Sequence, residues 1–106
     1  MQTLTEWQTN EFNDFIASKG TGVVEFGAPW CGACKMTEPQ LAEISKSYID
    51  IKFAKIDVGK NGPLAAKMGV MSLPNVIIFK DGKVKEQMIG AVTAKVMGDK
   101  LAKINN

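Results

Sequence analysis

Short runs of β-branched and aromatic residues alternate with segments of helical spacing along this chain of 106 residues. Phe12, Phe15 and Ile16 recur at positions i, i+3 and i+4, which predicts an amphipathic helix after Thr9 that ends towards residues 19–20. The segments expected next are, in order, strand 23–26, helix 31–48 kinked at Pro39, strand 51–58, helix 63–68, strand 75–80, strand 83–89 and a last helix capped by Thr93. The sequence leaves open a further strand at residues 2–4.

The order of these segments predicts the fold class. Strands that are separated by helices are joined by right-handed parallel crossovers. Asp81-Gly82, between the last two strands, is the strongest short hairpin signal in the chain and predicts an antiparallel pair. We therefore expect an α/β fold, with a central mixed β-sheet of four to five strands flanked by about four helices.

Length, hydropathy and charge narrow the class of protein. The length suits a single domain over residues 1–106. The apolar runs, such as 76–79, are only a few residues long, whereas a helix needs about 20 to cross a bilayer, so a membrane span is excluded. Thirteen basic and eleven acidic residues give a net charge of +2, and the lysines are scattered. Nucleic acid is therefore not an expected partner.

The first six residues carry neither a basic region nor the apolar segment of a signal peptide. A cytoplasmic location is expected on this ground, although the mature form of an exported protein would look the same. We also expect a monomer.

The chain has no histidine, which removes several kinds of catalytic site. Ser-His and Cys-His nucleophile pairs cannot form within it. Zinc sites take three or four protein ligands, mostly Cys and His, and the two cysteines alone cannot supply them. No metal site is expected within the chain.

Cys31 and Cys34 are the only cysteines, and they lie where a predicted strand passes into a helix. A structural disulfide across so short a loop would stabilise the fold by roughly 2 kcal/mol before strain, so stabilisation is a poor reason for this spacing. A second alternative, in which the two cysteines are small core residues, does not explain why both lie at a strand-to-helix junction. The free N–H groups of a helix start favour the Cys31 thiolate, and Cys34, one turn further in, can attack a mixed disulfide at Cys31. Cys31 is therefore predicted to attack and Cys34 to resolve.

Glu25 interrupts an otherwise apolar strand. It has two interpretations: a solvent-facing residue of an edge strand, or a buried acid. A desolvated carboxylic acid has a raised pKa and can exchange a proton with a thiol near neutral pH. We favour the buried acid, which would exchange its proton with Cys34.

The sequence Trp30-Cys31-Gly32-Ala33-Cys34-Lys35 resembles the active-site motif of the thioredoxin family. The resemblance extends over essentially the whole chain. Its further matches are Glu25, Pro39, Lys55, Leu73-Pro74, Asp81-Gly82 and Gly90-Ala91.

This resemblance implies a thioredoxin fold with a cis peptide bond at Leu73-Pro74 facing the cysteines; the residues alone would favour a trans bond. It implies a shallow groove for an extended protein substrate. Its expected contact residues are Trp30, Gly32, Ala33, Leu73, Pro74 and Gly90, with Met71 close by.

Two lysines have smaller expected roles. Lys55, a solvated strand residue on sequence alone, is implied by the resemblance to interact with Glu25, and Lys35 is expected at the surface, where it tunes the local charge.

The implied function is that of a protein-disulfide reductase. Electrons would come from a separate thioredoxin reductase, either a flavoprotein or a ferredoxin-linked enzyme, and would pass to disulfides in target proteins. No cofactor is expected, because the cysteine pair carries the two electrons and the chain lacks a Gly-rich nucleotide motif. Two alternatives stay open: a more oxidising oxidase or isomerase of the same fold, and a binding subunit that does not need its cysteines.

The chain departs from the family pattern at three positions. Thioredoxins usually have proline where Ala33 stands, aspartate where Glu25 stands, and often tryptophan where Gly27 stands. Ala33 restores a backbone N–H, which we expect to stabilise the Cys31 thiolate. Stabilising the reduced state makes a protein more oxidising, by about 30 mV for each 1.4 kcal/mol.

Overall fold

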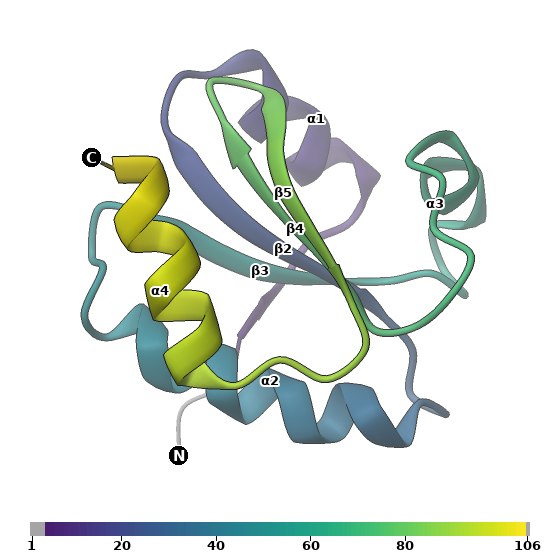
Figure 1. Cartoon of the computed structure of the whole chain (residues 1–106). Coiled ribbons are helices and arrows are strands. Elements are labelled where there is room, and N and C mark those ends of the chain that lie inside the picture. The colour runs from purple at the N-terminus through teal and green to yellow at the C-terminus, as the bar shows by residue number, and fades with distance from the viewer. Residues whose placement is uncertain (1–3, 106) are drawn as a thin grey trace.

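The computed structural model describes residues 4–105, which form a five-stranded mixed sheet with helices on both faces (Figure 1). The strand order is β1-β3-β2-β4-β5; β3 is parallel to β1 and β2, whereas β4 is antiparallel to β2 and β5. The elements are β1 (Thr5–Glu6), α1 (Thr9–Ala17), β2 (Thr21–Gly27), α2 (Gly32–Ser45), β3 (Lys52–Asp57), α3 (Gly62–Lys67), β4 (Asn75–Lys80), β5 (Lys83–Ile89) and α4 (Ala94–Asn105). The expected α/β thioredoxin fold is confirmed.

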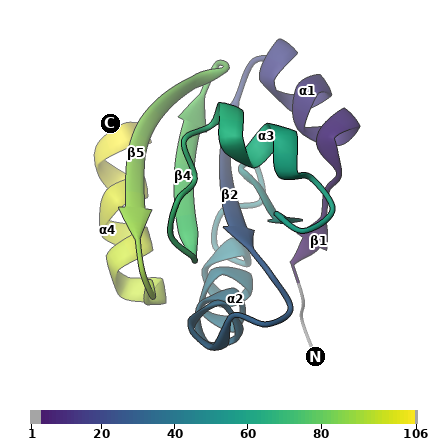
Figure 2. The same cartoon turned by 90° about the vertical axis from the view of Figure 1, so that its right-hand side faces the viewer.

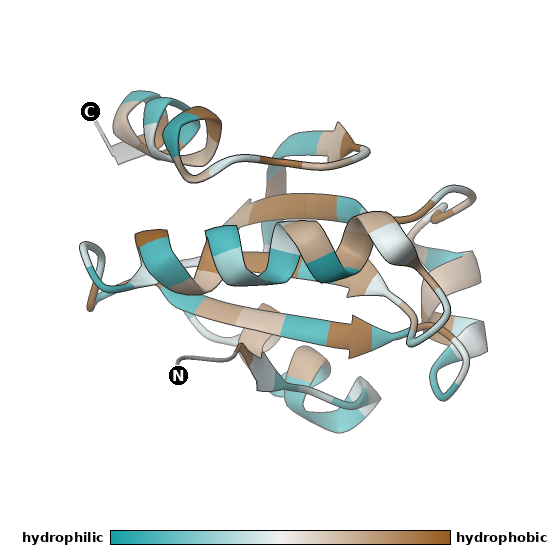
Figure 3. Cartoon of the chain, turned by 90° about the horizontal axis from the view of Figure 1, so that it is seen from below, coloured by the Kyte–Doolittle hydropathy of each residue, from teal (hydrophilic) through white to brown (hydrophobic). Residues whose placement is uncertain are grey.

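Each face of the sheet has its own hydrophobic core, because successive residues of a strand point to opposite faces. On β2, Val23 packs with α2 and α4, whereas Val24 and Phe26 pack with α1 and α3. Figure 2 shows the two helix pairs on opposite faces, and Figure 3 shows α2 crossing its face of the sheet. The same alternation directs Glu25 and Gly27 towards α2.

The hairpin and the last helix form as predicted. Asp81 and Gly82 have φ angles of 52° and 81°, and two successive left-handed residues make the tight turn that joins β4 to β5. The hydroxyl of Thr93 accepts a hydrogen bond of 3.2 Å from the Val96 N–H, which caps the start of α4. None of the helices within residues 4–105 has both the length and the apolar character needed to cross a bilayer.

Several boundaries differ from the sequence-based expectation. The further strand considered at residues 2–4 lies partly outside the described residues, because residues 2–3 are not described. Leu4 is a core residue outside any strand, and the first strand is β1 at Thr5–Glu6. Helix α2 runs through Pro39 and ends at Ser45 rather than near residue 48. Its end comes early because the next residues form i→i−3 hydrogen bonds, such as that of the Tyr48 N–H with the Ser45 carbonyl, which tighten the last turn.

Candidate active site

Cys31 and Cys34 form a disulfide at the junction of β2 and α2. Cys31 is the N-cap of α2, with φ −94° and ψ 108°, and its sulfur accepts a hydrogen bond of 3.1 Å from the Cys34 N–H. The two side chains differ in access: Cys31 is partly exposed, and Cys34 is fully buried. This is the arrangement expected of an attacking and a resolving cysteine.

The carboxyl group of Glu25 is buried on the face of the sheet that α2 covers. The side chain is completely inaccessible, and neither of its oxygens has a hydrogen-bond partner among the described residues. Burial, and after it the negative charge of Glu38, raise the pKa of Glu25 to about 8, against the opposing charge of Lys55. Glu25 is therefore mostly protonated at pH 7.

Gly27 lies between Glu25 and the buried cysteine. A Cβ atom at this position would lie 2.8 Å from the Cys34 sulfur and 3.1 Å from each Glu25 carboxylate oxygen. Because these distances are measured from one point, the sulfur and the nearest oxygen are no more than about 6 Å apart. One water molecule can span such a gap and carry a proton across it.

A cavity of about 290 Å³ opens beside these groups. Its floor includes Glu25 and Gly27, and charged side chains from three elements surround it. The charged lining residues are Glu6 of β1, Lys35 and Glu38 of α2, and Lys55 and Asp57 of β3. Because Gly27 has no side chain to fill the space, the cavity extends as far as the Glu25 carboxyl group.

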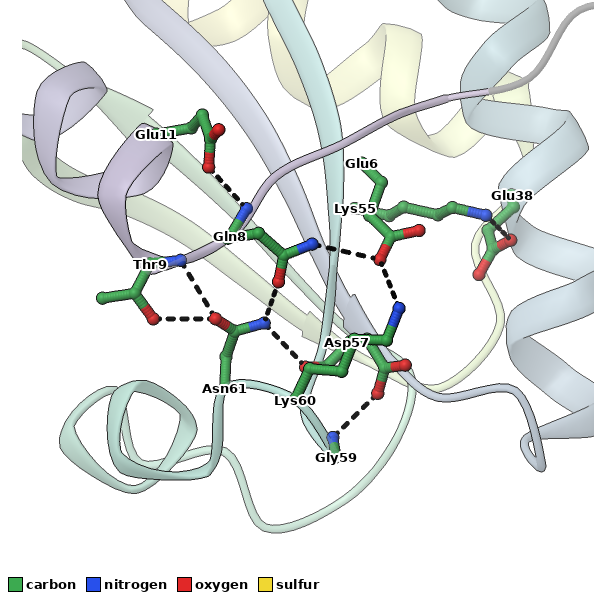
Figure 4. A network of polar contacts seen from close by, with 10 residues as sticks. All are labelled: Glu6, Gln8, Thr9, Glu11, Glu38, Lys55, Asp57, Gly59, Lys60 and Asn61. Atoms are coloured by element: carbon green, nitrogen blue, oxygen red, sulfur yellow. Dashed lines mark hydrogen bonds and ion pairs between the residues drawn. The ribbon is translucent and has the colours of Figure 1, made fainter.

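The interaction expected between Lys55 and Glu25 does not form as a direct contact. The Lys55 Nζ instead lies 3.3 Å from a carboxylate oxygen of Glu38 (Figure 4). Both partners of this pair are partly exposed, so they keep some hydration, whereas pairing with Glu25 would take the ammonium group into the protein interior. The charge of Lys55 still favours the ionised form of Glu25.

The loop before β4 carries the expected cis peptide bond at Leu73-Pro74. Phe26 is opposite Asn75 in the antiparallel register, so Pro74 lies at the end of the sheet where β2 leads to Cys31. Gly90, with φ 98°, donates its N–H to the Pro74 carbonyl at 2.9 Å. The structure thus brings two of the expected groove residues together.

The other expected site residues are exposed or partly exposed. Trp30 is 71% exposed, and its indole lies against Gly59, whose Cβ would come within 3.0 Å of the ring. Gly32 and Ala33 form the first turn of α2, Lys35 is exposed on it, and Met71 is 94% exposed in the loop before Leu73. Contact with a substrate stays a prediction for all of them.

Comparison with known proteins gives the family. The family model described as Thioredoxin matches residues 3–103. The chain belongs to the thioredoxin family. A thioredoxin of Bacillus subtilis is 46% identical over 74 residues, covering 69% of this chain and 71% of the relative. The chloroplastic M-type thioredoxin of Triticum aestivum is 42% identical over 86 residues, covering 80% of this chain but 49% of the relative, so the chain spans about half of that protein.

A solved structure supports the same assignment. The crystal structure of thioredoxin from Trypanosoma brucei brucei has a TM-score of 0.85 and 29% identity, and the match covers 98% of this chain and 94% of that one. The family and the Cys31-Cys34 disulfide together make the chain a thiol–disulfide oxidoreductase.

Glu38 was not among the site residues expected from the sequence, although it pairs with Lys55 and lines the cavity. A signal was present in the sequence: Glu38 follows Cys34 by four residues, and residues spaced by four lie on the same side of a helix. Within residues 4–105, no three Cys, Asp or Glu side chains are close enough together to hold a metal ion. The chemistry that the site supports is thiol–disulfide exchange with a buried acid at hand.

Proposed function

We propose that this chain reduces disulfide bonds in other proteins and is itself reduced by a separate thioredoxin reductase, a flavoprotein or a ferredoxin-linked enzyme. The observation that carries the proposal is the unequal access of two bonded cysteines, with Cys31 reachable at a helix start and Cys34 buried behind it. Such a pair separates attack on a bulky protein from the later release of that protein.

The reaction has two exchange steps. The Cys31 thiolate attacks one sulfur of the target disulfide, forms a mixed disulfide and displaces the other target sulfur as a thiolate. Cys34 loses its proton and attacks the Cys31 sulfur, which forms the Cys31-Cys34 bond and releases the second target sulfur. Two electrons thus pass to the target. Glu25, within about 6 Å of the Cys34 sulfur, can take up that proton through one water when its carboxyl group is ionised, which is the minor form at pH 7.

The groove residues are proposed to hold an extended segment of the target. Proline has no backbone N–H, which leaves the edge at Pro74 open to a substrate strand, and Trp30 offers exposed apolar surface beside Cys31. The target proteins, the monomeric state and the cytoplasmic location stay predictions; the relatives include chloroplastic proteins.

Reduction of insulin disulfides, followed by precipitation of the free chains in the presence of dithiothreitol, tests this function. The natural protein should accelerate precipitation, and Cys31→Ser should fall to the rate of dithiothreitol alone, because the attacking sulfur is lost. Full biological function in a Cys31→Ser, Cys34→Ser double variant would instead support the binding subunit.

The reduction potential distinguishes a reductase from an oxidase of the same fold. In the disulfide form, the hydrogen bond to the Cys31 sulfur comes from the Cys34 N–H, and the contribution of the Ala33 N–H to the thiolate stays a prediction. Ala33→Pro should lower the potential by roughly 30 mV or more, since one hydrogen bond to a charged group is lost. Equilibration of both proteins with a thiol redox buffer measures the change; an equal or higher potential in the variant contradicts the idea.

A further inference from the structure

Glu25 is the exception among the carboxylates that line the cavity, because the others have partners. Glu6 lies 3.6 Å from the Lys60 ammonium group, and Asp57 accepts a hydrogen bond of 2.8 Å from the Gly59 N–H (Figure 4). Glu25 is the most deeply buried of these acids, and no hydrogen bond reaches its oxygens among the described residues, although the Glu38 carboxyl group lies near enough to act on it. A buried acid without a partner needs an explanation in the surrounding charges.

Lys55, the neighbour of Glu25 on the adjacent strand, pairs with another carboxylate. Glu25 and Lys55 are register partners on the adjacent strands β2 and β3, and both side chains face α2. The Lys55 ammonium group nevertheless extends to Glu38 on α2, at 3.3 Å (Figure 4). Lys35, the other cation of the cavity wall, lies on the exposed side of the same helix.

We propose that Glu38 is a positioning residue for the redox reaction: by pairing with the Lys55 ammonium group, it keeps this cation from forming a direct ion pair with Glu25 and so keeps the buried acid protonated. Two contributions act in the same direction. The negative charge of Glu38 opposes ionisation of Glu25, and engagement of Lys55 withholds the counter-ion that would favour it.

The consequence for the reaction rests on the proposed reductase function. When an external thiolate attacks the Cys31 sulfur of the disulfide form, the Cys31-Cys34 bond breaks and Cys34 leaves as a thiolate. A protonated Glu25 can give that thiolate its proton across the gap of about 6 Å or less beside Gly27, and an ionised Glu25 cannot. Glu38 thereby extends the pH range in which the disulfide opens readily.

Titration of Glu25 in the disulfide form tests the proposal without an activity measurement. Both cysteines are bonded in this form, so no thiol titrates alongside Glu25. The infrared carbonyl stretch of a protonated carboxylic acid reports the protonation of Glu25 above pH 6, because carboxyl groups with ordinary pKa values are ionised there. In Glu38→Gln, which keeps the size of the side chain, the released Lys55 should turn to Glu25. The pKa of Glu25 should then fall from about 8 by one unit or more.

A double variant separates the two contributions. Lys55→Met removes the cation, so it should raise the pKa of Glu25 more in the Glu38→Gln background than in the natural protein. An equal rise in both backgrounds would show that Glu38 does not withhold Lys55. Glu43→Gln is the matched control, because Glu43 lies on the same helix, is 66% exposed and pairs with Lys46. It should leave the Glu25 titration unchanged, and an unchanged titration in Glu38→Gln as well overturns the proposal.

The rate at which dithiothreitol opens the Cys31-Cys34 disulfide gives the functional readout. At each pH, the rate for Glu38→Gln is divided by the rate for Glu43→Gln, which removes the effect of the titration of dithiothreitol itself. As the pH rises, this relative rate should begin to decline at a lower pH than the rate for the natural protein does. The difference should equal the shift in the Glu25 titration. A shifted titration with an unshifted rate profile would remove the catalytic role of Glu38. It would leave the proposed reductase function intact, since that function is judged by insulin reduction.

Discussion

Replacing Glu25 by leucine is expected to raise the free energy of unfolding at pH 7 by about 3 kcal/mol, relative to the natural protein. The pKa of Glu25 is about 8 in the folded chain and 4.5 in the ordinary reference, so the folded state holds a proton that the unfolded state releases. The contribution of Glu25 to stability is complete below pH 4.5. It is lost progressively as the pH rises from 4.5 to 8 and is constant above that range.

Urea denaturation of the disulfide form between pH 4.5 and 9 measures this effect. The Glu25→Leu variant should lack the decline between pH 5 and 8, and its advantage should vanish towards pH 4.5. Glu86→Leu is the control: it replaces a partly exposed strand glutamate that pairs with Lys100, and should change stability by only about 0.5 kcal/mol. A natural protein whose stability does not decline between pH 5 and 8 would show that Glu25 is ionised at pH 7.

Cys34→Ser is expected to convert the protein from a catalyst into a trap. Cys31 keeps its place at the start of α2 and can still attack a target disulfide, but the second exchange step has lost its nucleophile. With excess insulin and no added thiol, each molecule should complete less than one turnover and should accumulate as a mixed disulfide through Cys31. Mass spectrometry under non-reducing conditions detects the adduct.

Cys31→Ser is the matched control for this trap. It should form no adduct, because the remaining Cys34 is fully buried. Adducts of equal yield on both variants would mean that the two cysteines are equally reachable, and the assignment of attack to Cys31 would be wrong. Applied to a cell extract, the same Cys34→Ser variant would identify the target proteins by their covalent bond.

Local sequence patterns were sufficient to predict the elements around the site. The period-two and period-3.6 patterns predicted the strands and helices, and Asp81-Gly82 predicted the hairpin, because few residues tolerate two successive left-handed positions. The cis bond before Pro74 is different. Nothing local requires it, and it was expected only through the resemblance to thioredoxins.

The pairing of charges around Glu25 could not be predicted in the same way. The resemblance to thioredoxins implied that Lys55 would interact with Glu25, and the strand register does make them neighbours. The actual partner of Lys55 depends on how α2 lies across the sheet, which brings Glu38 within 3.3 Å. No pattern within one element contains that distance.

By itself the sequence determined the redox chemistry, since two cysteines three residues apart at a strand-to-helix junction, in a chain without histidine, leave few other reactions. The sequence already favoured Glu25 as the buried acid, but only the tertiary structure decided how strongly its pKa is raised and where the Lys55 ammonium group lies. Burial and charge–charge distances are properties of several elements packed together, and they set the pKa of Glu25 through contacts between residues far apart in the chain.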